Sequence, residues 1–195
     1  MSFLGVQEVH ITQTVSLVPL LRAPSSDTRA EISPVSVGTP PQVQTVILDT
    51  GSSDTYLDAR TASACEEASS ASNSCRGGTF DSSSSSTFTV TIPGGFDTAF
   101  GDGSTATGDF ATDVVHIGDV AINNVQFGVA TEVNSTTGFA VGLMGVGYSV
   151  NEASSTQYAN MPEVLHDAGI INSRLYSVFL NDLGKSLDQQ MMIHH

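Results

Sequence analysis

The sequence predicts an all-β protein, because short apolar runs alternate with turn-forming residues along most of the chain. Runs rich in Val, Ile, Thr and Phe are typical of strands. Gly, Pro, Ser and Asn separate these runs, and each of them favours turns. Only residues 161–168 combine helical apolar spacing with start and stop signals. The 195 residues are enough to bury a good core in one or two domains.

The expected strands are separated by recognisable turns. We expect one or two strands within residues 8–21, single strands at 30–37, 43–48, 55–57, 87–91, 97–100 and 105–116, a pair of short strands within 120–133, and a last strand at 177–180. The turn at 38–42 contains two prolines, which remove donors and interrupt a strand ladder. The glycines at 101–104 supply the positive φ angles of a tight hairpin tip.

The one expected helix is residues 161–168. Pro162 suits a first helical turn, and Gly169 is a typical residue at which a helix ends. Val164 and Leu165 supply an inward-facing apolar side. We therefore expect a β-protein with one short helix.

The composition argues against several classes of partner. The formal net charge is −14, so binding to nucleic acid or to an anionic membrane surface is not expected. No apolar run reaches about eighteen residues, so no membrane-spanning helix is predicted. The five histidines lack metal-ligand spacing, and the glycines at 142–147 do not fit a nucleotide loop. We predict no metal and no other cofactor.

The candidate chemistry centres on Asp49, which follows the apolar run at 46–48. Such a run is typical of a buried strand, and a carboxylate that leaves it needs hydrogen bonds to offset desolvation. Thr50, Gly51 and Ser52 supply backbone N–H groups and hydroxyls within one turn. A plain strand-to-turn junction would use the same residue types for conformational reasons alone.

The surroundings of Asp49 favour the chemical interpretation. Gly38-Thr39-Pro40-Pro41-Gln42 lies upstream, and Phe100-Gly101-Asp102-Gly103-Ser104 lies downstream. Together with Asp49-Thr50-Gly51-Ser52, these motifs resemble the N-terminal lobe of a pepsin-like aspartic protease, in particular the secreted fungal and yapsin-type members. The resemblance runs from about residue 29 to residue 182, in family order throughout.

This resemblance implies one lobe of the bilobal pepsin-like acid protease fold, with double-psi β-barrel-type sheets and a short helix. Residues 29–182 would be the N-terminal catalytic lobe with its flap hairpin, 1–28 an N-terminal strand segment, and 183–195 a divergent tail. The family implies a secreted or cell-surface protein. Residues 1–23 lack the basic leader and apolar core of a signal peptide. We expect the chain to begin near the mature enzyme, or its gene model to lack a first exon.

The resemblance also implies an aspartic-type endopeptidase that hydrolyses an extended peptide or protein substrate at acid pH. In such enzymes, as in pepsin, two carboxylates share one proton and activate a water molecule. Asp49 would be the first-lobe member of this pair. Ser52 would hydrogen-bond the outer carboxylate oxygen, Gly51 would offer its N–H, and Thr50 would brace the turn against the other lobe.

The hairpin tip would be the flap, which closes over the substrate and excludes water. The residues expected to form the flap and bind substrate are Tyr56, Phe100, Gly101, Asp102, Gly103 and Ser104. The family usually has tyrosine at the position of Phe100 and tryptophan at that of Tyr56. Phe100 has no donor, so the usual hydrogen bond between them is lost. We expect ring packing between the two residues and a looser flap or altered pocket.

A partner carboxylate for Asp49 is not evident. No second Asp-Thr-Gly or Asp-Ser-Gly follows, and Asp167 ends the predicted helix without a preceding apolar strand. Asp102, Asp109 and Asp113 fit solvated or turn positions. The preferred hypothesis is a first lobe that works with a missing C-terminal lobe. An inactive single-lobe protein that binds a peptide or an inhibitor comes next. A homodimer that pairs two Asp49 residues ranks last, because two flaps would compete over one cleft.

Cys65 and Cys75 lie in a Ser-, Ala- and Gly-rich segment at 61–86. That composition usually marks a flexible linker, and the two cysteines alone are compatible with free thiols or a disulfide. The resemblance implies a surface loop closed by one disulfide, and hence an oxidising compartment. Closing so short a loop adds about 2–3 kcal/mol in the chain-entropy model. Asn134 begins an Asn-Ser-Thr glycosylation sequon, usable only in a secreted chain.

Overall fold

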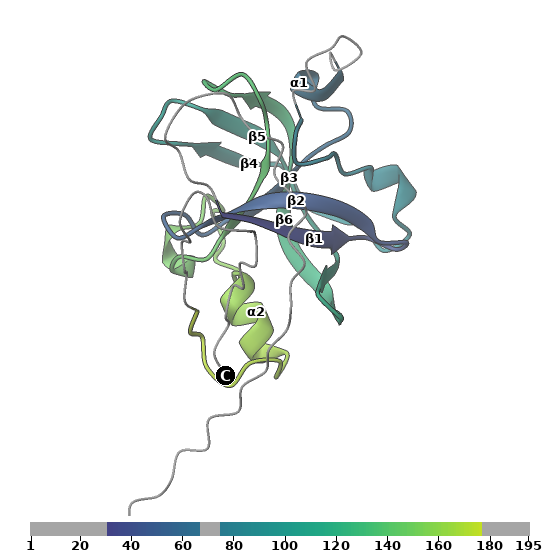
Figure 1. Cartoon of the computed structure of the whole chain (residues 1–195), viewed down its shortest axis with the longest axis vertical. Helices are drawn as coiled ribbons and strands as arrows, with labels where there is room; N and C mark the ends of the chain where they lie inside the picture. Colours follow the sequence, from purple (N-terminus) through teal and green to yellow (C-terminus); the bar gives the residue numbers. More distant parts are fainter. Residues whose placement is uncertain (1–30, 67–74, 177–195) are drawn as a thin grey trace, which may run out of the picture.

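The computed structural model describes residues 31–66 and 75–176 (Figure 1). Strands and short helices in this part are β1 (Glu31–Val37), β2 (Gln42–Asp49), β3 (Thr55–Asp58), α1 (Ser63–Glu66), η2 (Ser82–Ser84), β4 (Thr89–Ala99), β5 (Thr105–Ile117), β6 (Val120–Asn134), β7 (Gly142–Gly145), η3 (Ser149–Asn151) and α2 (Met161–Asp167). The strands expected at 8–21 and 177–180, and the tail at 183–195, lie outside the described residues. The described part is therefore mainly β-structure, which confirms the predicted fold class.

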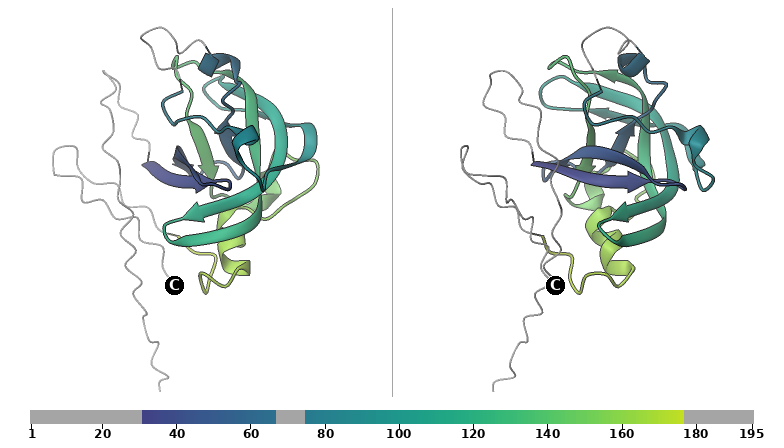
Figure 2. Two further views of the ribbon diagram at one scale, coloured as in Figure 1. Left: turned by 90° about the vertical axis from the view of Figure 1, so that its right-hand side faces the viewer. Right: turned by 45° about the vertical axis from the view of Figure 1, so that its right-hand side comes forward.

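The strands close into a barrel. Their order is β1-β2-β7-β3-β6-β5-β4, and β1 pairs again with β5 at Ser36–His116 and Val37–Val115. This second pairing joins β1, β2, β7, β3, β6 and β5 in a ring, while β4 extends the sheet beyond β5. The pairs β2–β7 and β3–β6 are parallel, whereas β3–β7 is antiparallel. The views in Figure 2 show the β1–β2 hairpin and the long curved strands β5 and β6 as parts of the same barrel.

Strand β6 corrects the expectation of two short strands within 120–133. A bulge keeps one long strand continuous there, because the pairing with β5 shifts register between Asp113 and Val115. Asn124 takes a φ of 57° at this point, a left-handed conformation that asparagine tolerates better than most residues. Asn123 and Asn124 therefore lie at an irregularity inside one strand.

Strand β4 likewise joins the two segments expected at 87–91 and 97–100. Its register with β5 shifts twice, between Val90 and Ile92 and between Ile92 and Phe96. Gly94 has a φ of 63°, and its N–H donates to Asp109 Oδ1 at 2.7 Å. This side-chain acceptor satisfies a backbone donor at the irregularity, so the strand continues through a segment that reads as a break.

The core consists of two apolar clusters. The larger one fills the barrel and includes Val46, Leu57 and Phe127, with Phe80 packed edge-on against Phe127. The smaller one lies beneath the β4–β5 hairpin and consists of Tyr56, Phe96, Ala106, Phe110 and Ala130. Tyr56 belongs to the smaller cluster. Strand β3, which follows the Asp49 turn, therefore places this tyrosine in the core under the hairpin.

Helix α2 covers one end of the barrel, below the β1–β2 hairpin in Figure 1. Its N-cap, Asn160, accepts from the Glu163 N–H, and the Glu163 carboxylate accepts from the Asn160 N–H, which completes a capping box. Leu165 is buried in the main core and Val164 packs partly against it. Gly169 follows with a φ of 71°, a conformation that favours glycine. The predicted helix and both of its end signals are confirmed.

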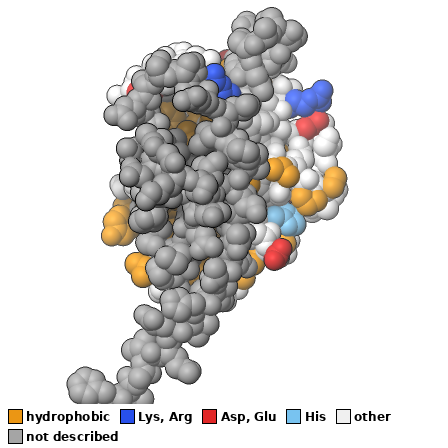
Figure 3. Space-filling view, in the orientation of Figure 1, with side chains coloured by type: hydrophobic (Ala, Val, Ile, Leu, Met, Phe, Trp, Pro, Cys, Tyr) orange, Lys and Arg blue, Asp and Glu red, His pale blue; other side chains and the backbone are white. Residues whose placement is uncertain are grey.

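Two of the described arginines are paired with nearby carboxylates on the surface. On the face drawn in Figure 3, the described basic side chains form no broad patch. Arg60 is paired with Asp81 at 3.1 Å, and Arg174 with Glu163 at 3.2 Å. Among the described residues, no helix is long and apolar enough to cross a membrane.

Candidate active site

Asp49 ends β2 and opens the turn at residues 50–52. In the parallel pairing of β2 with β7, Asp49 lies opposite Gly145. Its side chain is half-buried, whereas Thr50 and Gly51 are exposed. The Gly51 N–H donates to Asp49 Oδ1 at 2.9 Å. The strand thus delivers a carboxylate to the surface, where a backbone donor orients it.

The predicted hydrogen bond from Ser52 to Asp49 is not formed in this structure. The Ser52 hydroxyl is buried and has no hydrogen-bond partner among the described residues. The Ser52 carbonyl accepts from the Gly147 N–H at 2.8 Å, and the hydroxyl of Ser53 donates to the Tyr148 carbonyl at 2.6 Å. These contacts fix the turn through the residues after β7, independently of the Ser52 hydroxyl.

The glycine-rich segment at 142–147 supports the turn directly. The Val146 N–H donates to the Asp49 carbonyl at 2.9 Å, and the Gly145 N–H donates to the Asp54 carbonyl at 2.9 Å. A Cβ on Gly145 would lie 2.5 Å from the Ser53 carbonyl carbon. Only glycine allows the two backbones to approach this closely.

We expect Gly145→Ala to lower the free energy of unfolding by about 1–3 kcal/mol, because the added Cβ overlaps backbone atoms that cannot move without shifting the turn. Urea unfolding measures the difference. Gly101→Ala is the matched control, since a Cβ on Gly101 would have nothing within 4 Å. A Gly145→Ala protein as stable as the Gly101→Ala protein would show that the close contact is not needed.

A second carboxylate, Asp54, lies buried five residues after Asp49 and was not anticipated from the sequence. It accepts from the Tyr158 hydroxyl at 2.6 Å and from the Ala153 N–H at 2.7 Å. Burial, and then the charges of Asp54 and Glu163, raise the pKa of the neighbouring Glu152 to about 7. The sequence signal was an acidic residue directly before the buried strand β3, which requires partners from elsewhere. These bonds tie the segment after η3 to the Asp49 turn.

The hairpin tip between β4 and β5 consists of residues 100–104. The Phe100 N–H donates to the Ser104 carbonyl at 2.9 Å, and Gly103 has a φ of 88°. Asp102 accepts from the Ser104 N–H at 2.8 Å, from the Ser104 hydroxyl at 3.0 Å and from the Thr136 hydroxyl at 2.9 Å. The Ser104 N–H, followed by the two hydroxyls, holds the pKa of this exposed carboxyl below its usual range.

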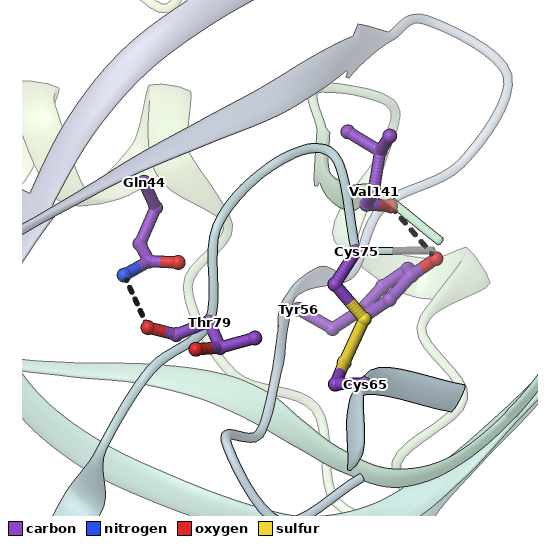
Figure 4. The surroundings of a disulfide bond; sticks show 6 residues. All are labelled: Gln44, Tyr56, Cys65, Cys75, Thr79 and Val141. Atoms are coloured by element: carbon purple, nitrogen blue, oxygen red, sulfur yellow. Dashed lines mark hydrogen bonds between the residues drawn. A yellow bond between two sulfur atoms is a disulfide. The ribbon is translucent and has the colours of Figure 1, made fainter. Parts of the chain in front are cut away.

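Tyr56 lies beneath the hairpin tip. Its ring centroid is 6.1 Å from that of Phe100 and 5.4 Å from that of Phe96. The phenol donates to the Val141 carbonyl at 3.3 Å (Figure 4). Burial, with the charges of Asp58 and Asp102, raises its pKa. Tyr56 and Phe100 therefore pack together without a mutual hydrogen bond, because the only hydroxyl of the pair bonds elsewhere.

Cys65 and Cys75 form a disulfide with a Cα–Cα distance of 5.3 Å, close to Tyr56 and Val141 in Figure 4. Cys75 also pairs with Ala140 in an isolated parallel bridge. The disulfide therefore closes the Ser-rich segment on itself between residues 65 and 75, and the pairing of Cys75 with Ala140 joins it to the chain next to β7. This arrangement favours the interpretation as a closed surface loop, and not as a linker between domains.

Comparison with known proteins identifies the family. A family model described as eukaryotic aspartyl protease matches residues 31–193. The chain belongs to this family. It is 39% identical over 155 residues to the probable aspartic-type endopeptidase opsB of Aspergillus fumigatus, which covers 76% of this chain and 30% of that protein. It is 34% identical over 163 residues to aspartic proteinase yapsin-3 of Saccharomyces cerevisiae, covering 78% and 31%.

A third relative is candidapepsin of Candida tropicalis, 39% identical over 150 residues, covering 75% of this chain and 36% of that protein. The chain thus spans about a third of the length of the curated relatives it matches. The described barrel is one all-β lobe of the pepsin-like fold of this aspartyl protease family, as the sequence motifs imply.

The other acidic residues of this aspartyl protease lobe occupy varied positions. Asp167 is exposed at the end of α2 and contacts His166 at 3.0 Å and Arg174 at 3.2 Å, away from any apolar strand. Asp113 corrects the expectation of a solvated residue, because it is only 2% exposed. Its Oδ1 accepts from the Thr87 hydroxyl at 2.5 Å and from the Val114 N–H at 2.8 Å. These bonds satisfy one carboxyl oxygen, whereas Oδ2 is buried with no hydrogen-bond partner among the described residues.

Asp58 is the most deeply buried acidic side chain that the sequence did not single out. It ends β3 with 1% of its surface exposed, and neither carboxyl oxygen has a hydrogen-bond partner among the described residues. Burial raises its pKa to about 7. No group of His, Cys, Asp or Glu in the described part of this aspartyl protease chain is arranged to hold a metal ion.

Proposed function

We propose that this chain is the first lobe of an aspartic-type endopeptidase that hydrolyses peptide bonds at acid pH. The observation that carries the proposal is the placement of the half-buried Asp49 at the end of β2, where β2 pairs in parallel with β7 and the exposed turn at residues 50–51 begins. Its carboxylate is oriented by the Gly51 N–H, and the turn is held by the Val146 N–H. Family membership supports the reaction class.

In the proposed reaction Asp49 takes a proton from a water molecule while a second carboxyl donates a proton to the scissile carbonyl oxygen. Two carboxyls about 3 Å apart share one proton, since like charges at that distance cannot both ionise. We place the second carboxyl in a C-terminal lobe, because the matched relatives are about three times as long as the aligned part of this chain.

Surface features beside the turn support a contact with that second lobe. Thr50 and Gly51 are exposed, and the residues that follow β7 include Tyr148 and Val150, which are 82% and 71% exposed. Neighbouring exposed apolar side chains of this size are typical of interaction surfaces. We propose that Thr50 braces the turn against the other lobe there.

We propose that residues 100–104 act as a flap over an extended peptide. Gly101 is exposed, and a Cβ there would have nothing within 4 Å, so its backbone is open to a substrate strand. Main-chain pairing of this kind binds many sequences, with pockets selecting side chains. Phe100 and Tyr56 would line one such pocket, with Asp102, Gly103 and Ser104 shaping the tip.

We further propose that the protein is secreted or held at the cell surface. The Cys65–Cys75 disulfide supports an oxidising compartment. Asn134 is exposed at the end of β6, so its sequon is open to glycosylation.

The decisive experiment determines the transcript downstream of residue 182 and assays the protein it encodes. We expect a second Asp-Thr-Gly or Asp-Ser-Gly in frame, and cleavage of a denatured protein that is fastest at acid pH and inhibited by pepstatin. A protein encoded without that motif, monomeric by light scattering and inactive at acid pH, would overturn the proposal. It would favour a single-lobe protein that binds peptides or inhibitors.

A further inference from the structure

The hairpin tip is bonded to the loop between β6 and β7, residues 135–141. The Thr136 hydroxyl donates to Asp102 Oδ2 at 2.9 Å, and the Thr136 N–H donates to the Ser104 hydroxyl at 3.1 Å. Within the tip, the Ser104 N–H and hydroxyl both donate to Asp102. Residue 136 is separated from residue 102 by more than thirty positions, so these are tertiary contacts and not local turn geometry.

The loop that holds the tip is itself anchored to the barrel. The Arg76 N–H donates to the Ala140 carbonyl at 2.9 Å, and the Arg76 guanidinium lies 4.3 Å from the centre of the Phe139 ring. Cys75, next to Arg76, carries the disulfide. On the other side, the Tyr56 phenol donates to the Val141 carbonyl (Figure 4). A fixed loop can restrain the tip, whereas a loose loop could not.

The hairpin lacks another polar restraint from the strand beneath it. Phe100 contributes only a ring contact with Tyr56, since a phenyl group has no donor or acceptor. The bonds between Thr136 and the tip are the polar contacts that the described residues provide across this gap. Because Asp102 carries a charge, the Thr136 hydroxyl bond to it is stronger than a bond between neutral groups.

We infer that Thr136 is a positioning residue that latches the flap to the β6–β7 loop through Asp102 and Ser104. The role of this hairpin as a flap rests on the proposed function, whereas the latch itself rests on the hydrogen bonds alone. The latch sets the resting position of the tip over Tyr56. It replaces the restraint that Phe100 cannot supply.

Thr136 is also the third residue of the Asn134-Ser135-Thr136 sequon, and Asn134 pairs with Thr105, the first residue of β5 after the tip. Loss of the threonine hydroxyl would therefore remove a glycosylation signal together with the latch bond to Asp102, while the Thr136 N–H could still donate to Ser104. Three variants separate the two effects. Thr136→Val removes the sequon and the latch bond to Asp102, Thr136→Ser keeps both, and Asn134→Gln removes only the glycan acceptor.

Amide hydrogen exchange on the whole chain, read by mass spectrometry, tests the latch. The reporter is the Ser104 N–H, which is bonded to Asp102. We expect Thr136→Val, which removes one hydrogen bond to Asp102, to speed exchange in the peptide that contains residues 100–104 by about five- to ten-fold. Asp102→Ala, which also removes the acceptor of the reporter N–H, should speed it at least as much. Thr136→Ser and Asn134→Gln should exchange at the rate of the unchanged protein, and the double variant should exchange no faster than Asp102→Ala.

Exchange in β2 and β3 controls for folding. If Thr136→Val leaves the tip unchanged, whatever Asp102→Ala does, or if Thr136→Val speeds exchange equally in every peptide, the latch is overturned. If Thr136→Val fails to fold, Thr136→Ala removes the same hydroxyl from an exposed position and leaves the bonds between Ser104 and Asp102 in place. The readout needs no catalysis. An inactive protein with a latched tip would contradict the proposed function alone, and an active one with an unlatched tip would contradict this inference alone.

Discussion

Asp49→Asn is expected to lower kcat/KM for peptide hydrolysis by roughly 10³- to 10⁴-fold in the protein that carries both lobes, the scale of a lost general base. Asparagine keeps an oxygen that can accept from the Gly51 N–H, which now lies 2.9 Å from Asp49 Oδ1. The turn should therefore keep its shape while losing the group that takes a proton from water. Initial rates on a denatured protein at acid pH give the measurement.

Asp167→Asn is the matched control for this loss. Asp167 is also followed by a glycine two residues later, yet it is exposed and bonded to His166 and Arg174 on the helix surface. We expect this variant to keep near-normal activity and stability, since exposed ion pairs contribute little. Full activity of Asp49→Asn, or loss in Asp167→Asn alone, would transfer the catalytic role away from the strand end.

The parts of the fold that the sequence predicts are those determined by local signals. Residues close together in the sequence determine three of these parts, namely the β2 strand, the Asp49 turn and helix α2. Pro162 and Gly169 at the ends of the helix are examples. The sequence predicted β4 and β6 each as two short strands. In the structure each is one continuous strand, because register shifts and a hydrogen bond to the Gly94 N–H accommodate the irregular positions. Such irregularities depend on the partner strand, which a linear pattern does not contain.

The contacts of the candidate site were less predictable for the same reason. Asp54 finds its partner Tyr158, and Asp102 finds Thr136, across more than thirty residues of chain. No spacing rule connects these pairs. The motif around Asp49 could be identified because its donor, Gly51, is two residues away. Bonds between distant residues had to come from the structure.

Asp58 makes the stability of this lobe depend on pH. Its pKa is about 7 in the folded chain, raised by burial from an ordinary value of 3.8. Because the folded value is higher, the folded state holds a proton that the unfolded state has released between about pH 4 and pH 7. The contribution of this bound proton to the free energy of unfolding is complete below about pH 4 and is lost as the pH rises through about 7. A shift of about three pH units corresponds to about 4 kcal/mol.

We therefore expect Asp58→Asn to raise the free energy of unfolding at pH 8 by about 3–4 kcal/mol and to leave it nearly unchanged at pH 4. Asparagine resembles the protonated acid in shape and cannot ionise, so the buried site never holds an unpaired charge. Urea unfolding at the two pH values, with and without the substitution, gives the four numbers required.

Two further variants show whether the effect belongs to this site. Asp119→Asn removes the same charge from an exposed residue, so any gain it gives at pH 8 measures relief of the net charge of −14 and nothing more. Glu152→Gln addresses the other carboxyl whose pKa is raised to about 7, and its effect should be smaller because that side chain is only partly buried. If Asp58→Asn gains no more than Asp119→Asn at pH 8, the buried carboxyl does not control the pH dependence. If Asp58→Asn raises the free energy of unfolding at pH 8 and Asp119→Asn does not, ionisation of the buried Asp58 carboxyl, and not repulsion between surface charges, limits the stability of the lobe at neutral pH. The lobe would then be adapted to acid through a core residue of β3.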